Sequence, residues 1–177
     1  MTKERDLISP GIVAPGGVWA DFGSGTGIFT RELYGLLGPT CELYSIDRNA
    51  RDLEQQRRSF AQAFPTANVH FLHANFTQPM QLPPLDGIVM ANALHYVPYA
   101  QQPDVLTSIV GYLRRPGGRL ILVEYNAEVG NPWVPYPISS EAFTRLAAKV
   151  GLAVPAVLHT VPSRFLREMY AALALRE

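Results

Sequence analysis

The feature that most constrains this chain is a regular alternation of short apolar runs with segments in which apolar residues recur every three or four positions. The first pattern indicates buried strands and the second amphipathic helices. Such alternation predicts an α/β fold with a mostly parallel sheet, right-handed crossovers and helices on both faces. The predicted strands are 17–22, 42–46, 69–72, 87–91 and 119–125, and the predicted helices are 28–37, 50–64, 104–113 and 139–150.

The tail from Ala153 to Leu175 allows two interpretations. It reads as two strands that turn near Pro162–Arg164, but the alanines and leucines of Met169–Leu175 favour a helix on local propensity alone. Neither a repeat nor a linker interrupts the chain, so its 177 residues predict one domain. The first 16 residues and the long loop 126–138 are the segments left over to cover a site.

Composition excludes several classes of protein. Fifteen basic and 15 acidic residues give zero net charge, which removes the broad positive field of a typical nucleic-acid-binding protein. A single cysteine, Cys41, excludes internal disulfides and cysteine-based zinc sites and suggests a reducing, cytoplasmic environment. No apolar run approaches the roughly 20 residues of a membrane span, and no secretory signal core follows the N-terminus. We therefore expect neither nucleic acid nor membrane as a partner.

A glycine-rich segment, Asp21–Gly27 (DFGSGTG), separates the first predicted strand from the first predicted helix. In a doubly wound sheet this turn lies at the carboxyl ends of the strands, where ligands bind. A tight strand-to-helix turn needs only one glycine, whereas here three alternate within five positions. Because glycines let the backbone approach a ligand closely, the segment predicts a nucleotide-type ligand.

Asp47 ends the second predicted strand, 20 residues after Gly27. A carboxylate at this spacing suits the two hydroxyls of a ribose. Asp47 could instead cap the following helix, but Asn49 is also a good cap and would free it. The loop departs from the dinucleotide pattern, whose third glycine would fall at Ile28. Asp21 would also repel a pyrophosphate, whereas it suits a ligand that carries ammonium and sulfonium charges.

Segments along nearly the whole chain resemble the class I S-adenosylmethionine-dependent methyltransferases of the small-molecule type. The glycine segment resembles their first motif, and Tyr44–Asp47 resembles their ribose-binding acid. The other matching segments, in order, are 86–97 (DGIVMANALHYV), 113–123 (LRRPGGRLILV) and 165–174 (FLREMYAALA). The resemblance implies a Rossmann-like, seven-stranded sheet whose last strand is antiparallel, so it favours a strand over a helix in the tail.

The resemblance also implies roles by position. The loop glycines would line the methionine half of S-adenosylmethionine, Asp21 would help to hold its amino group and Asp47 its ribose. Asn75 stands where an acidic residue commonly accepts from the adenine amino group, and its amide can still accept or donate. The implied cofactor-binding residues are Asp21, Phe22, Gly23, Ser24, Gly25, Gly27, Asp47, Arg48, Asn75, Phe76 and Asn92.

Methyl transfer from a sulfonium needs alignment and exclusion of water, and it needs a base only when the acceptor arrives protonated. His95, which follows the fourth strand, is the candidate base, although a packing or hydrogen-bonding role for it is the preferred alternative. Candidate substrate residues are His95, Tyr96, Trp133 and Tyr136. The last two belong to loop 126–138, which is predicted either to wall the substrate or to plug a sheet edge.

The expected reaction is methylation of an O, N, S or C atom of a small molecule, by a monomer or homodimer. Asn92 is followed by Ala-Leu-His rather than Pro-Pro-Tyr, which argues against the amino-methyltransferases that use that motif. No acidic cluster indicates a magnesium site, so no metal is expected. Zero net charge favours a neutral or modestly charged acceptor. Two alternatives stay open: a non-catalytic cofactor-binding subunit or scaffold, and a nicotinamide-dependent oxidoreductase.

Overall fold

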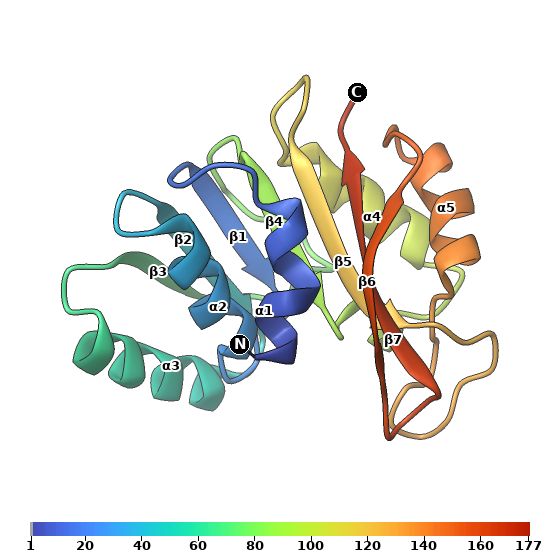
Figure 1. The fold of residues 1–177 in the computed structure, drawn as a ribbon, viewed down its shortest axis with the longest axis horizontal. Coiled ribbons are helices and arrows are strands. Elements are labelled where there is room, and N and C mark those ends of the chain that lie inside the picture. The colour runs from blue at the N-terminus through green and yellow to red at the C-terminus, as the bar shows by residue number, and fades with distance from the viewer. Residues whose placement is uncertain (1) are drawn as a thin grey trace.

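A computed structural model describes residues 2–177, which form a seven-stranded sheet with flanking helices (Figure 1). The strand order is β3-β2-β1-β4-β5-β7-β6. The strands are β1 (Val18–Phe22), β2 (Glu42–Asp47), β3 (Asn68–His73), β4 (Gly87–Ala91), β5 (Arg119–Tyr125), β6 (Ala156–Pro162) and β7 (Glu168–Leu175). Strands β1 to β5 pair in parallel, and β7 is antiparallel to both β5 and β6. This confirms the predicted fold class.

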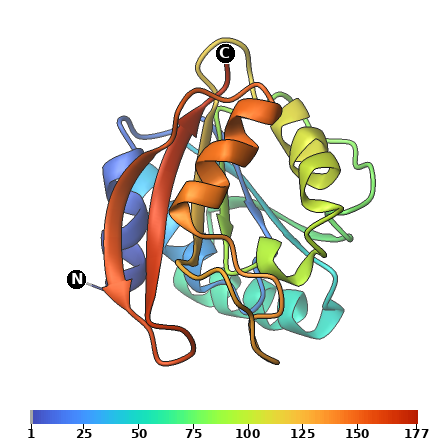
Figure 2. The same ribbon diagram turned by 90° about the vertical axis from the view of Figure 1, so that its right-hand side faces the viewer.

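Helices cover both faces of the sheet (Figure 2). One side carries α1 (Lys3–Ile8), α2 (Ile28–Leu37) and α3 (Ala50–Ala63), and the other carries α4 (Gln102–Gly111) and α5 (Ser140–Lys149). Two apolar clusters of buried residues occupy these two sides, as expected when helices bury both faces of a parallel sheet. Short 3-10 turns, η1 (Ser9–Gly11) and η2 (Leu94–Tyr96), follow α1 and β4. No helix within residues 2–177 has the length and apolarity required to cross a membrane.

The predicted elements differ from the observed ones mainly at their ends. The helix predicted over 104–113 is α4 at 102–111, because Pro103 stands in its first turn and Leu113 pairs with Leu85 in an isolated β-bridge instead. The prediction of two strands in the tail is confirmed by β6 and β7, and the alternative of a helix over Met169–Leu175 is wrong, since this segment forms β7 between β5 and β6. Pairing of this segment with β5 on one edge and β6 on the other outweighs its local propensity for helix. Helix α1 lies in a segment for which no element was predicted.

Candidate active site

The glycine loop follows β1 and crosses the carboxyl ends of β1 and β2. The amides of Gly23 and Ser24 both donate to the carbonyl of Ile46, at 2.8 and 3.0 Å, which fastens the loop to the end of β2. All three glycines have positive φ. Gly27 also meets a neighbour closely, since a Cβ there would lie 2.5 Å from the side chain of Gln56. The loop therefore requires glycine for its backbone shape and, at Gly27, for the close approach of the Gln56 side chain.

A buried polar network supports this loop from below. The Gln56 side chain, on α3, is fully buried, and its amide nitrogen donates to the Gly25 carbonyl at 2.7 Å and to the Ser24 hydroxyl at 3.0 Å. Its amide oxygen accepts from the Ser45 hydroxyl at 2.9 Å. Since its polar groups are partnered, the network fixes the loop without the cost of an unsatisfied buried group. Sequence reasoning missed Gln56, although it interrupts the apolar stripe of Leu53 and Phe60.

Asp21 lies beneath the loop rather than at a cavity wall. Its side chain is buried, and the Thr30 hydroxyl donates to it at 2.6 Å. Burial is the main reason why the pKa of Asp21 rises from 3.8 to about 7; the nearby Asp47 charge adds to the rise, and the Thr30 hydrogen bond opposes it. The contact of Asp21 with a cofactor amino group stays a prediction.

The raised pKa of Asp21 predicts that the protein loses stability as the pH rises. Between pH 4 and 7 the folded protein retains a proton on Asp21 that the unfolded chain has released, so the stabilisation is complete below pH 4 and is lost as pH rises through 7. From pH 5 to pH 8, urea unfolding should show a loss about 2 kcal/mol larger in the wild type than in Asp21→Asn, which keeps an acceptor for Thr30. Equal losses in both proteins would contradict this.

Asp47 is held at the end of β2 with its carboxylate at the surface of the loop. One oxygen accepts from the Gly25 amide and the other from the Asn49 amide, both at 2.8 Å. Each oxygen retains a free lone pair, so the carboxylate can still accept two ligand hydroxyls. Asn49 caps α3 by accepting from the amides of Arg51 and Asp52. The cap is therefore Asn49, which was the sequence-based condition for leaving Asp47 free.

Asn92 stands directly after β4 in a strained conformation. It is the one non-glycine residue with positive φ in the described chain, at 52°, a region that asparagine tolerates better than most residues. Its side-chain oxygen is buried and has no hydrogen-bond partner within residues 2–177. A strained residue with an orphaned buried acceptor is uncommon outside functional sites.

A cavity of about 540 Å³ opens between the glycine loop and the turn after β4. Gly23, Gly25, Asp47 and Asn92 contribute to its wall, and so do Arg48, Asn49, Asp52, Asn75, Phe76, Thr77, Ala93, Tyr96, Val97, Pro98 and Gln101. Most of the predicted cofactor residues are thus brought together. Asp21, Phe22, Ser24 and Gly27 do not line it. Phe22 packs in the core, and the Ser24 hydroxyl belongs to the network under the loop.

Asn75 also lines this cavity, and the oxygen of its side-chain amide is already used by hydrogen bonds within the protein. Its side-chain oxygen accepts from the amide and from the hydroxyl of Thr77, at 3.1 and 2.9 Å. The remaining donor is the amide nitrogen, which would suit a ring nitrogen better than an exocyclic amino group.

A second cavity, of about 500 Å³, shares the lining residue Asn92 with the first. Its wall comes from five parts of the chain: α1, the start of α2, the turn after β4, the end of β5 and the β6–β7 hairpin. The lining residues are Lys3, Glu4, Phe29, Asn92, Tyr125, Pro162, Ser163, Arg164, Phe165 and Met169. Segment 1–16, predicted as a cover, thus contributes two side chains, while Met1 lies outside the described residues. Sequence reasoning placed none of the α2, β5 and hairpin residues in a site.

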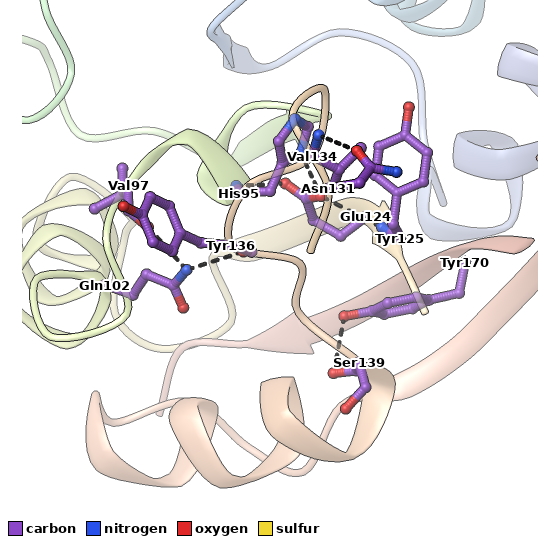
Figure 3. A network of polar contacts seen from close by, with 10 residues as sticks. All are labelled: His95, Val97, Gln102, Glu124, Tyr125, Asn131, Val134, Tyr136, Ser139 and Tyr170. Atoms are coloured by element: carbon purple, nitrogen blue, oxygen red, sulfur yellow. Dashed lines mark hydrogen bonds and ion pairs between the residues drawn. The ribbon is translucent and has the colours of Figure 1, made fainter. Parts of the chain in front are cut away.

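His95 is part of a buried polar cluster that includes Glu124 (Figure 3). The Glu124 side chain is fully buried, and its carboxylate accepts from the His95 amide at 3.1 Å and lies 2.8 Å from the His95 Nδ1. The imidazole is 2% exposed and lines neither cavity. This placement favours a structural role for His95, and its role as a base stays a prediction. Glu124 was missed, because a buried acid inside an apolar strand has no sequence signature.

Loop 126–138 returns to the same cluster. The Tyr136 amide donates to the His95 carbonyl at 3.0 Å, and the Gln102 side chain donates to the carbonyls of Val97 and Tyr136 (Figure 3). The Trp133 side chain, in contrast, is 66% exposed and contacts neither cavity. Of the four predicted substrate residues, only Tyr96 lines a cavity described above. The substrate roles of the others stay predictions.

The comparisons with known proteins agree with this geometry. Residues 20–118 match the family described as methyltransferase domain, which is more than half of the chain. The chain belongs to this family. The match spans the glycine loop, Asp47 and Asn92 and ends where β5 begins. The chain is thereby a class I methyltransferase domain, and S-adenosylmethionine is the methyl donor of that class.

The curated relatives of this chain share about a third of its residues over the matched part. The ubiquinone/menaquinone biosynthesis C-methyltransferase UbiE of Ectopseudomonas mendocina is 32% identical over 141 residues, which cover 78% of this chain and 54% of the relative. The chain thus spans about half the length of the curated relatives it matches.

Solved structures share the fold at lower identity. The 1,6-didemethyltoxoflavin-N1-methyltransferase of Burkholderia thailandensis, with bound S-adenosylhomocysteine, superposes with a TM-score of 0.78 at 17% identity, covering 98% of this chain and 78% of that one. Magnesium protoporphyrin IX methyltransferase of Synechocystis, with bound S-adenosylmethionine, gives a TM-score of 0.71 at 16% identity, covering 92% and 71%.

The residues of the first cavity fit this cofactor. A Cβ on Gly25 would point into open space beside the cavity, so the loop leaves room for a ligand there. The Asp47 carboxylate suits the ribose hydroxyls, and the unpartnered oxygen of Asn92 suits a donor such as an ammonium group. Carboxylate and amide oxygens at the wall agree with a cationic ligand better than with a pyrophosphate.

Proposed function

We propose that this chain transfers a methyl group from S-adenosylmethionine in the first cavity to a small-molecule acceptor in the second. The supporting observation is that Asn92 lines both cavities, which places them side by side at the end of β4. Transfer requires contact between the methyl group and the acceptor atom, and adjacent binding sites are the arrangement that this contact needs. A larger cavity of about 620 Å³ beside loop 126–138 shares no residue with the first and lacks this property.

In this proposal the residues of the chain bind and orient the reactants. Bound S-adenosylmethionine supplies an electrophilic methyl group on a positively charged sulfur. Asp47 would bind the ribose, the glycine loop would admit the amino-acid part and Asn92 would accept a hydrogen bond at the junction. Phe29, Tyr125 and Phe165 would exclude water from the acceptor. Since the leaving group is already activated, this arrangement can act without a base from the protein.

Thermal unfolding tests the proposed cofactor. S-adenosylhomocysteine at 100 times its Kd should stabilise the protein by about 2.7 kcal/mol and raise the melting temperature visibly, whereas NADH should not. A shift with NADH and none with S-adenosylhomocysteine would overturn the proposal in favour of an oxidoreductase.

Turnover separates the enzyme from a cofactor-binding scaffold. The protein should convert S-adenosylmethionine to S-adenosylhomocysteine with at least one member of a panel of small acceptors that offers O, N, S and C nucleophiles. The panel has to include carbon nucleophiles, because the named function of the curated relatives is C-methylation. Cofactor binding without turnover on the whole panel would favour the scaffold.

A further inference from the structure

The second cavity has a distinctive chemistry, and the following inference about it rests on the proposed function. Aromatic rings and a thioether form much of its wall. The rings of Tyr125 and Phe165 meet edge to face, with centroids 6.4 Å apart and planes at 88°. Phe29 and the buried thioether of Met169 form the rest of this apolar wall. Aromatic rings and a thioether are the groups that pack best on a planar aromatic molecule.

The charges at the mouth of the cavity favour an anion. Lys3 and Arg164 are the cations of its wall and Glu4 is its carboxylate, so the wall carries one net positive charge. Glu4 lies 3.9 Å from Lys3 and offsets that ammonium group. No carboxylate of residues 2–177 lies within salt-bridge distance of Arg164. Among the residues that the structure describes, Arg164 is therefore the cation of this wall that has no acidic partner.

Hydrogen bonds of the turn hold the backbone on either side of Arg164, whose side chain is exposed. The Ser163 amide donates to the Arg167 carbonyl at 3.0 Å, and the Phe165 amide donates to the Ser163 hydroxyl at 3.2 Å. The Asn131 side chain donates to the Phe165 carbonyl at 3.0 Å and ties the turn to loop 126–138. The guanidinium carbon of Arg164 lies 5.1 Å from the centre of the Phe165 ring, within the range of a cation–π contact. The cation is thus held against an aromatic wall.

We infer that the acceptor is a planar aromatic molecule that bears a carboxylate, and that Arg164 is the residue that recognises this carboxylate. Arginine suits the role because its planar group can form two parallel hydrogen bonds with a carboxylate. An acceptor of this kind would place its ring among the aromatic side chains and its charge toward the hairpin turn. Arg164 would then select the substrate without contacting the reacting atoms.

The test uses a matched pair of probes on protein saturated with S-adenosylhomocysteine: 3-hydroxy-2-naphthoate and its uncharged methyl ester. At 150 mM salt, which screens long-range attraction, the acid should bind wild-type protein about tenfold more tightly than the ester. Arg164→Gln should remove this difference by weakening the acid and leaving the ester unchanged. Arg167→Gln is the control, because Arg167 lies on the same turn but lines the separate cavity of about 620 Å³.

The outcomes distinguish this inference from the function on which it rests. Equal affinities of acid and ester in the wild type, or equal losses in the Arg164 and Arg167 variants, would overturn the role of Arg164. Binding of S-adenosylhomocysteine without binding of either probe would overturn the aromatic acceptor while leaving the proposed function standing. Absence of S-adenosylhomocysteine binding would instead count against the proposed function.

Discussion

Gly25→Ala should lower the affinity for S-adenosylhomocysteine at least tenfold while leaving the protein folded. The new Cβ would meet no protein atom within 4 Å. Since Gly25 lines the first cavity, we expect the added methyl group to take space that a bound ligand needs. Alanine at φ 53° costs roughly 1–2 kcal/mol of stability, which a folded domain of 5–15 kcal/mol can tolerate. Calorimetric titration gives the affinity, and urea unfolding gives the stability.

Gly117→Ala is the matched control for this effect. Gly117 also has positive φ, at 90°, and also has open space where its Cβ would be, but it lies outside the first cavity. Its φ is farther from the left-handed minimum near +57°, so this variant should lose at least as much stability. Cofactor affinity should nevertheless stay at the wild-type value. Similar losses of affinity in both variants would mean that backbone strain, rather than the occupied space, is the cause.

Glu124→Ala should destabilise the protein by about 3–5 kcal/mol, because several buried donors lose their acceptor and each unsatisfied donor costs about 1–3 kcal/mol. The carboxylate accepts from the amides of His95 and Tyr125, at 3.1 and 3.3 Å, and lies 2.8 Å from the imidazole of His95. Its removal leaves these buried donors unsatisfied between β5 and the turn after β4. The free energy of unfolding in urea measures the effect.

Two further variants make the result of Glu124→Ala interpretable. Glu128→Ala removes the same charge from an exposed position in the adjoining loop, together with the hydrogen bond that Glu128 accepts from the Ser139 hydroxyl at 2.6 Å, and should cost about 1 kcal/mol. Glu124→Gln keeps the shape and one acceptor, so it should be destabilised by an intermediate amount and stay measurable if the alanine variant does not fold. If the alanine variants at 124 and 128 lose the same stability, the pair with His95 contributes little.

The sheet and the cofactor loop could be predicted from the sequence because their signals are local. Apolar periodicity distinguishes strands from helices, and the alternation of both implies the crossover topology. The glycines of Asp21–Gly27 and the acid at Asp47 follow from spacing alone, since parallel strands bring their carboxyl ends to one edge. The final strand was the exception, because its local propensity pointed to a helix and only its pairing with β5 and β6 makes it a strand.

Contacts between distant parts of the chain were decided by the tertiary structure alone. Gln56 supports a loop 31 residues away, and Glu124 holds a turn 29 residues away; nothing in the neighbourhood of either residue identifies its distant partner. The same holds for Arg164, which becomes part of a cavity only when the β6–β7 turn meets α1 and the ends of β4 and β5. The sequence by itself therefore determined the fold and the edge of the sheet where we propose that the cofactor binds, because periodicity and turn chemistry act over a few residues. The cavity proposed for the acceptor was decided by packing, because burial and pairing of polar groups depend on which segments the fold brings together.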